Sequence, residues 1–176
     1  GFCIFNDIAI ASTVLLEHRL AKTILIVDSD VHQGNGTANL LRSQENVYTL
    51  SLHSARNYPH VKAASNLDVS LPDGVQDIDY LEIFSDVLDQ SIECFNPQVV
   101  FFLAGADIFE GDRLGRLKIS KDGIRRRDEL FFSKFDVLKT KIVVVMGGGY
   151  APNVRDIVDI HSGTIEAACN AWERRH

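Results

Sequence analysis

Short apolar segments alternate along this chain with longer stretches in which apolar residues recur every three or four positions. The short segments lie at residues 24–28, 47–53, 99–103 and 142–146 and are rich in Val, Ile, Leu and Phe. Such runs are typical of strands buried on both faces of a parallel sheet. We therefore predict four strands, each followed by a turn or by polar residues.

The stretches between these strands predict amphipathic helices, because their apolar positions repeat with the helical period. We expect helices over 6–18, 37–42 and 77–95, and a further helix after a charged, glycine-containing loop at 108–119. Asn6 or Asp7 can cap the first of these helices. In the helix after the loop, the expected inward residues are Ile124, Phe131, Phe135 and Leu138.

The last helix follows Pro152, a residue that suits a first helical turn. Residues 54–76 show little periodicity, so we predict a loop whose length favours a functional role. His161, on an apolar face of the last helix, is expected to be a satisfied core histidine rather than a ligand. The expected inward stripe of that helix is Val154, Ile157, His161, Ile165, Ala168 and Trp172.

Strands that alternate with helices predict an α/β domain with a mostly parallel sheet. In such sheets, ligands bind outside the carboxyl ends of the strands. Three of the predicted strands end in unusual chemistry: Asp28, Asp30 and His32 follow the first, Asp107 the third, and Gly147–Tyr150 the last. This coincidence predicts one active site at that edge of the sheet.

Asp30, His32 and Asp107 form a plausible set of metal ligands. Three protein ligands leave a position for water and substrate, as in catalytic zinc sites, whereas structural zinc sites are closed by four ligands. The same donors suit Fe(II), Co(II) or Mn(II), and ligand type does not choose among them. The alternative is a strand end capped only by hydrogen bonds; the position of Asp107 argues for the metal site.

Tyr150 follows three glycines, which allow the backbone to bring the phenol over the site. Its hydroxyl could donate a hydrogen bond to an oxyanion that develops on a carbonyl. On these four residues alone, a tight turn with a packed aromatic side chain is the favoured interpretation.

Composition excludes several classes of protein. The net charge is −6 and basic residues form no patch, so nucleic acid is not the expected partner. No apolar run is long enough to span a membrane, and no signal-peptide pattern is present. Cys3, Cys94 and Cys169 lack metal-binding spacing, and we expect buried thiols in a reducing compartment. Residues 125–129 (Arg-Arg-Arg-Asp-Glu) predict a solvated helix face with local ion pairs.

Four motifs, taken together, resemble the zinc-dependent histone deacetylase family. They are Asp28-Ser-Asp30-Val-His32-Gln-Gly-Asn-Gly36, Gly105-Ala-Asp107, Glu110-Gly-Asp-Arg-Leu-Gly115 and Gly147-Gly-Gly-Tyr150. The likeness is closest to the class IV branch and its bacterial relatives, and it covers essentially the whole chain. It implies the arginase/deacetylase-like fold, a three-layer α/β sandwich around a mostly parallel sheet.

The resemblance also implies roles for individual residues. Zinc would be bound by Asp30, His32 and Asp107, with Tyr150 stabilising the transition state, and Asp28 and Asn35 orienting two proton-transfer histidines. A structural potassium ion would be held by Asp28, Asp30, His32, Ser51 and Leu52. The expected substrate pocket comprises Gly1, Phe2, Tyr58, Leu114 and Gly148.

The family carries its His-His pair a few residues before the segment that matches Gly1. We therefore expect residues 1–176 to be the C-terminal part of a single deacetylase-like catalytic domain, incomplete at its N-terminus. The isolated chain is expected to show very weak turnover or none, even when it binds metal. Asn35 stands where other branches have aspartate, which would make the second histidine less easily protonated.

The expected activity is metal-dependent hydrolysis of acyl-lysine amides to a free amine and a carboxylate. Acetylated polyamines or other small acylated amines are alternative substrates, and a non-catalytic metal-binding or interaction module is the alternative from another class. An arginase-type hydrolase is disfavoured, since Ile108 and Phe109 offer no further carboxylates. No nucleic-acid or membrane partner is expected, and the expected compartment is the cytoplasm, or the nucleus in a eukaryote.

Overall fold

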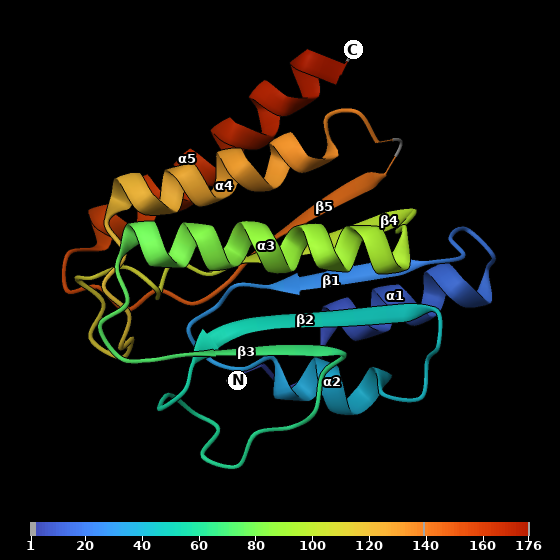
Figure 1. Ribbon diagram of the computed structural model, residues 1–176, viewed down its shortest axis with the longest axis horizontal. Coiled ribbons are helices and arrows are strands. Elements are labelled where there is room, and N and C mark those ends of the chain that lie inside the picture. Colours follow the sequence, from blue (N-terminus) through green and yellow to red (C-terminus); the bar gives the residue numbers. More distant parts are fainter. Residues whose placement is uncertain (1–2, 139, 176) are drawn as a thin grey trace.

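A computed structural model describes residues 3–138 and 140–175 of the chain, and its centre is a parallel five-stranded sheet (Figure 1). The order of the strands is β3-β2-β1-β4-β5, and every neighbouring pair is parallel. This arrangement confirms the predicted α/β class and parallel sheet. The strands are β1 (Ile24–Asp28), β2 (Val47–Ser54), β3 (Leu67–Leu71), β4 (Val99–Ala104) and β5 (Lys141–Met146).

Helices cover both faces of the sheet and give the molecule three layers (Figure 1). One face packs against α3, α4 and α5, and the other against α1 and α2. The bounds of the helices are α1 (Asp7–Glu17), α2 (Asn35–Leu41), α3 (Asp77–Phe95), α4 (Lys121–Phe135) and α5 (Val154–Arg175).

Local signals in the sequence explain where several helices begin and end. The Asn6 side chain accepts a hydrogen bond from the Ala9 amide and caps α1, and Ser120 caps α4 in the same way through Gly123. Asn96 ends α3 in the left-handed conformation that asparagine tolerates. These caps fix the helices that carry the core side chains.

The larger core lies between the sheet and α3, α4 and α5, and it is rich in phenylalanine. Phe84 of α3, Phe102 of β4 and Phe131 of α4 are fully buried. The rings of Phe102 and Phe131 stack with their centroids 3.9 Å apart. This aromatic packing holds β4, and with it the segment that carries Asp107, against the helices.

The predicted loop at 54–76 is wrong in part, because it contains β3. In β3 the side chains of Leu67, Val69 and Leu71 face the protein while Asp68 and Ser70 are exposed. This period of two is typical of a strand packed on one side only. β5 is likewise less buried than its apolar run predicted, since it is the last strand in the sheet order.

The predicted inward stripe of α5 is wrong in part: Ile157 and Ala168 pack against the core as predicted, but the other apolar members of the stripe are exposed. The helix buries Ile160, Thr164, Ala167 and Ala171 instead, and Trp172 is 64% exposed. Small residues on the buried face let α5 pack against α4, and Thr164 donates a hydrogen bond to the buried Asp128 of that helix. The buried face of α5 is therefore the one that fits against α4, and not the one with the largest apolar side chains.

Three further expectations about burial are wrong. Cys3, Cys94 and Cys169 are exposed rather than buried. Arg127 and Asp128 are fully buried, although the flanking Arg125 and Arg126 are exposed and pair with Asp122 as predicted. Half-buried His161 is not a satisfied core histidine, since its Nδ1 has no hydrogen-bond partner among the described residues.

Candidate metal centre

Two adjacent parallel strands place the candidate ligands at one edge of the sheet. β1 ends at Asp28 and pairs in register with β4, where Asp28 lies opposite Leu103. Asp30 and His32 therefore leave β1 beside the segment that leads from β4 to Asp107. The Val31 amide donates to Asp107 Oδ1 at 2.9 Å, which ties the two segments together.

The structure brings Asp30, His32 and Asp107 into one cluster. His32 Nδ1 lies 3.0 Å from Asp30 Oδ1 and 3.2 Å from Asp107 Oδ2. One donor atom from each residue lies within 4.8 Å of the others. Two carboxylates and one imidazole at this spacing can share a single cation.

The close approach of the two carboxylates and the His32 ring shifts the pKa values of all three residues. Burial and the nearby Asp30 charge raise the pKa of Asp107 to about 7. Burial would also raise the pKa of Asp30, but hydrogen bonds from the His32 ring and from the His32 and Gly148 amides lower it. The hydrogen bonds to Asp107 and Asp30 raise the pKa of His32 to about 9.

Asp28 adds a further buried acid next to this cluster. Its burial, reinforced by the Asp30 charge, raises its pKa well above the ordinary value. Unpaired carboxylates in such surroundings are costly unless a cation compensates them. The donor set therefore fits a divalent metal ion such as zinc, and oxygen and imidazole donors also suit iron, cobalt or manganese.

Glycines allow the backbone to pack directly against the cluster. The Gly148 amide donates to Asp30 Oδ2 at 2.9 Å, and a Cβ at Gly148 would lie 2.3 Å from Asp107 Oδ2. A Cβ at Gly105 would lie 2.6 Å from the Asp30 Cα. The segment Gly147–Tyr150 is therefore more than a tight turn, because its backbone forms one wall of the cluster.

Asp112 fixes the backbone of Tyr150, a contact that sequence reasoning missed. Its Oδ2 accepts a hydrogen bond from the Tyr150 amide, and Arg113 Nε donates to the Tyr150 carbonyl at 3.0 Å. Asp112 Oδ1 also accepts from the amides of Leu114 and Gly115. Asp112 and Arg113 therefore hold the backbone of Tyr150 against the loop that follows Asp107.

Asn57 is a second residue that sequence reasoning missed. Its side chain is buried, and Nδ2 donates to the Leu114 carbonyl at 2.8 Å while lying 3.5 Å from His32 Nε2. It thus links the ring of a candidate ligand to the loop that carries Leu114. Within residues 54–76, no sequence pattern distinguished Asn57 from an ordinary loop asparagine.

Of the residues expected to bind potassium, Asp28 lies on β1 and Ser51 and Leu52 lie on the neighbouring β2, whereas Asp30 and His32 follow the end of β1. Asp28 pairs in register with Ser51, and the Ser51 hydroxyl accepts a hydrogen bond from the Gly34 amide at 3.2 Å. Leu52 is fully buried beside Ser51. Asn35 begins α2, two residues beyond the turn that carries His32 and Gln33.

The expected pocket residues are distributed unevenly. Gly148 touches the cluster, whereas Tyr58 and Leu114 are exposed, Tyr58 by 59%. Tyr150 is 39% exposed at the surface near Arg113. Gly1 and Phe2 lie outside the described residues.

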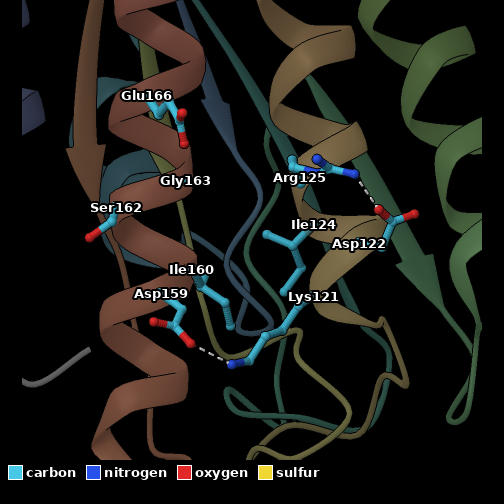
Figure 2. Close-up of a pocket in the computed structure, with 9 residues that line it drawn as sticks. All are labelled: Lys121, Asp122, Ile124, Arg125, Asp159, Ile160, Ser162, Gly163 and Glu166. Carbon is cyan, nitrogen blue, oxygen red and sulfur yellow. Dashed lines mark hydrogen bonds and ion pairs between the residues drawn. The ribbon is translucent and has the colours of Figure 1, made fainter.

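A cleft of about 390 Å³ between α4 and α5 lies away from this chemistry (Figure 2). Most of its charged side chains are already in ion pairs. Lys121 lies 2.6 Å from Asp156 and 2.8 Å from Asp159, and Arg125 pairs with Asp122. The cleft is lined by none of the cluster residues, so it is not the candidate site.

Among the described residues, no helix has the length and apolar character needed to cross a bilayer.

Comparison with known proteins gives a consistent result. Residues 1–164 match the histone deacetylase domain family. An uncharacterized protein from the cyanobacterium Picosynechococcus is 43% identical over 98% of this chain and 57% of its own length. Histone deacetylase 2 of Arabidopsis thaliana is 35% identical over 85% of this chain and 40% of its own length.

Two solved structures have a similar fold. The HD domain of HDA15 superposes with a TM-score of 0.79 at 29% identity, over 99% of this chain and 54% of that domain. Acetylpolyamine aminohydrolase from Burkholderia pseudomallei gives 0.82 at 22% identity, over 95% of this chain and 50% of that enzyme, which establishes likeness of fold alone. The chain spans about half the length of the relatives it matches.

The fold and the cluster define an α/β domain of the deacetylase fold class with a carboxylate–imidazole centre at the carboxyl edge of its sheet. The family match covers residues 1–164, well over half of the chain. The chain belongs to the histone deacetylase family.

Proposed function

We propose that this chain forms the metal-binding part of a deacylase that hydrolyses acyl-lysine amides to an amine and a carboxylate. Asp30, His32 and Asp107 are the proposed zinc ligands. The observation that carries the proposal is the convergence of their donor atoms within 4.8 Å, with Asp107 buried and Asp30 and His32 partly exposed. The histone deacetylase relatives support the same class of reaction.

A divalent cation at this cluster would supply Lewis acidity toward an amide carbonyl and would make a water molecule more acidic. The residues of the chain have separate tasks. The Val31 amide and Gly148 backbone orient the Asp107 and Asp30 carboxylates. The proposed role of Tyr150 is to donate its hydroxyl to the oxyanion that develops on the carbonyl.

Asp112 supports that role, because its hydrogen bond to the Tyr150 amide holds the backbone from which the phenol extends. The proposal also assigns Asp28, Ser51 and Leu52 to a structural potassium ion, together with backbone oxygens of Asp30 and His32. The paired register of Asp28 and Ser51 supports this assignment.

Exposed Tyr58 and Leu114 are proposed to line the entrance, where an aromatic face suits the aliphatic stem of an acylated lysine. Acetylated polyamines are the competing substrates. A panel of acyl-lysine peptides and N-acetylated polyamines separates the two: the proposal expects higher kcat/KM for the peptides, and higher values for polyamines would overturn the substrate assignment.

The test of the reaction is a Tyr150→Phe variant, with Tyr48→Phe on β2 as a matched control at the opposite end of the sheet. Hydrolysis is measured for this chain and for the longest natural polypeptide that contains it, before and after removal of metal by a chelator. The chain alone is expected to turn over weakly. In the longer polypeptide, losing one oxyanion donor should lower the rate by about 10²–10³ with little change in metal affinity.

The control should keep the wild-type rate. Hydrolysis that survives complete metal removal, or a Tyr150→Phe variant as active as the wild type, would overturn the proposed mechanism.

A further inference from the structure

Arg127 is a fully buried cation in the middle of α4. Its guanidinium lies 2.7 Å from Asp128 Oδ1 through Nη2, and its Nε donates to the same oxygen at 2.8 Å. Its Cζ lies 5.4 Å from the centroid of the buried Phe102 ring. The ion pair is anchored in turn by α5, since Thr164 Oγ1 donates to Asp128 Oδ2 at 2.6 Å.

The guanidinium also interacts with the buried Tyr80 hydroxyl of α3, and a further hydrogen bond leads to the metal centre. Arg127 Nη1 donates to the Gly105 carbonyl at 2.8 Å. Gly105 is wedged between the two candidate carboxylate ligands: a Cβ there would lie 2.6 Å from the Asp30 Cα and 2.9 Å from Asp107 Oδ1. The buried cation therefore holds the peptide unit around which both acids are arranged.

The other side of this segment is held by backbone contacts. The Ala106 amide donates to the Gly148 carbonyl at 2.7 Å, and the Gly148 amide donates to Asp30 Oδ2. Gly105–Asp107 thus lies between the Gly147–Tyr150 segment and the Arg127 fork. A small rotation of the Gly105 peptide would displace Asp107 relative to Asp30.

We propose that Arg127 is a positioning residue for the metal centre, which fixes Asp30 and Asp107 in a metal-binding arrangement through the Gly105 carbonyl. This inference rests on the proposed metal site. Stability alone does not require the ion pair, because apolar residues of similar volume often replace a buried pair without loss. Apolar residues cannot donate to Gly105, however, and groups that orient metal ligands typically change metal affinity by about 10–100-fold.

The test is the double variant Arg127→Met/Asp128→Leu, which removes both charges together and leaves neither acid nor cation unpaired. Zinc affinity is measured by competition with a chromophoric chelator, and the ligand field by the visible spectrum of bound Co²⁺. Circular dichroism and thermal unfolding establish that the variant is folded. We expect a folded protein with a zinc Kd raised about 10–100-fold and an altered cobalt spectrum.

Two further variants make the result decisive. Thr164→Val removes the contact between α5 and Asp128 but leaves the Arg127–Gly105 hydrogen bond, so its Kd and cobalt spectrum should stay close to wild type. Arg127→Lys keeps the buried charge but lacks the planar fork that serves Asp128 and Gly105 together. It should also bind zinc more weakly, and it tests the inference if the double variant does not fold.

A folded double variant, or the Lys variant, with wild-type affinity and spectrum would overturn the positioning role. Equal losses in Thr164→Val and the double variant would also overturn it, because they would indicate general loosening between α4 and α5. If the wild-type chain itself binds no Co²⁺, the proposed metal site fails instead, so the two failures are distinguishable.

Discussion

Asp107 is held by contacts to both of its carboxylate oxygens. It is fully buried, it accepts the Val31 amide through Oδ1, and its Oδ2 faces the His32 ring. The Gly148 backbone approaches the same oxygen so closely that a side chain has no room. These contacts fix the position of the Asp107 carboxylate. Its negative charge remains able to bind a cation.

Gly148→Ala tests this packing, with Gly163→Ala as the matched control. A methyl group at Gly148 would collide with Asp107 Oδ2, whereas nothing lies within 4 Å of a Cβ at Gly163 in α5. We expect zinc affinity to fall at least about tenfold for Gly148→Ala. Gly163→Ala should keep the affinity and gain about 0.5–1 kcal/mol in unfolding free energy, because alanine is the better helix former.

Isothermal titration with zinc and urea unfolding measure the two quantities. Unchanged zinc binding in Gly148→Ala would contradict the described packing of the Gly147–Tyr150 segment against the acids.

For individual residues, the sequence was sufficient to predict the three candidate metal ligands but not the residues that hold them in place. Asp30, His32 and Asp107 stood out because unusual polar residues followed apolar strands. Asn57, Asp112 and Arg127 did not, since their partners are backbone carbonyls or amides of residues distant in sequence. Partners of that kind become visible only when the chain is folded.

An element was predictable where one helical periodicity dominates, as in α3, or where an unbroken apolar run marks a buried strand, as in β1. They were not predictable where polar partners select the buried face. In α5 the apolar stripe at Val154, Ile165 and Trp172 is exposed, and the buried face includes Thr164, which contacts Asp128. Asp128 also forms a buried ion pair with Arg127 of α4, and this pair explains why the charged residues 125–129 are only partly exposed to solvent.

His161 of α5 predicts a dependence of stability on pH. Burial lowers its pKa below the ordinary 6.5, the Arg127 charge in α4 lowers it further, and Asp128 acts in the opposite direction. The unfolded state therefore binds more protons at this residue than the folded state does below pH 6.5. The contribution of His161 to the unfolding free energy should fall as pH drops from 6.5, until the folded-state pKa of His161 is passed.

Urea unfolding of the wild type and of His161→Gln between pH 8 and acid conditions measures this effect, with exposed His18→Gln as control. The advantage of the wild type over His161→Gln should shrink toward acid pH, while His18→Gln should parallel the wild type. Parallel curves for all three proteins would contradict the assignment.

At the scale of the whole molecule, a five-stranded parallel sheet with helices on both faces brings two strand ends together at one edge. The buried Asp28 and Asp107 and the partly buried Asp30 meet there, and the crowding raises the pKa values of Asp28 and Asp107. A bound cation would relieve this repulsion. The two relatives named above are similar to this chain over 57% and 40% of their own length. Metal binding and global stability should therefore be linked.

Zinc should raise the unfolding free energy of the chain, by about 2.7 kcal/mol when free zinc is 100 times its Kd. Asp107→Asn should abolish this gain, because the amide cannot supply the second charge while its carbonyl oxygen can still accept the Val31 amide. Thermal unfolding with zinc, with chelator, and with an exposed control variant, Asp86→Asn, measures the difference. An equal gain in Asp107→Asn and the wild type would place the zinc elsewhere.

The most direct measurement is anomalous X-ray scattering at the zinc edge from crystals of the chain grown with zinc. The account predicts one peak at about 2.0–2.2 Å from a carboxylate oxygen of Asp30, His32 Nδ1 and a carboxylate oxygen of Asp107, with a further coordination position left open. A peak remote from these residues, or an ion closed off by a fourth protein ligand, would contradict it.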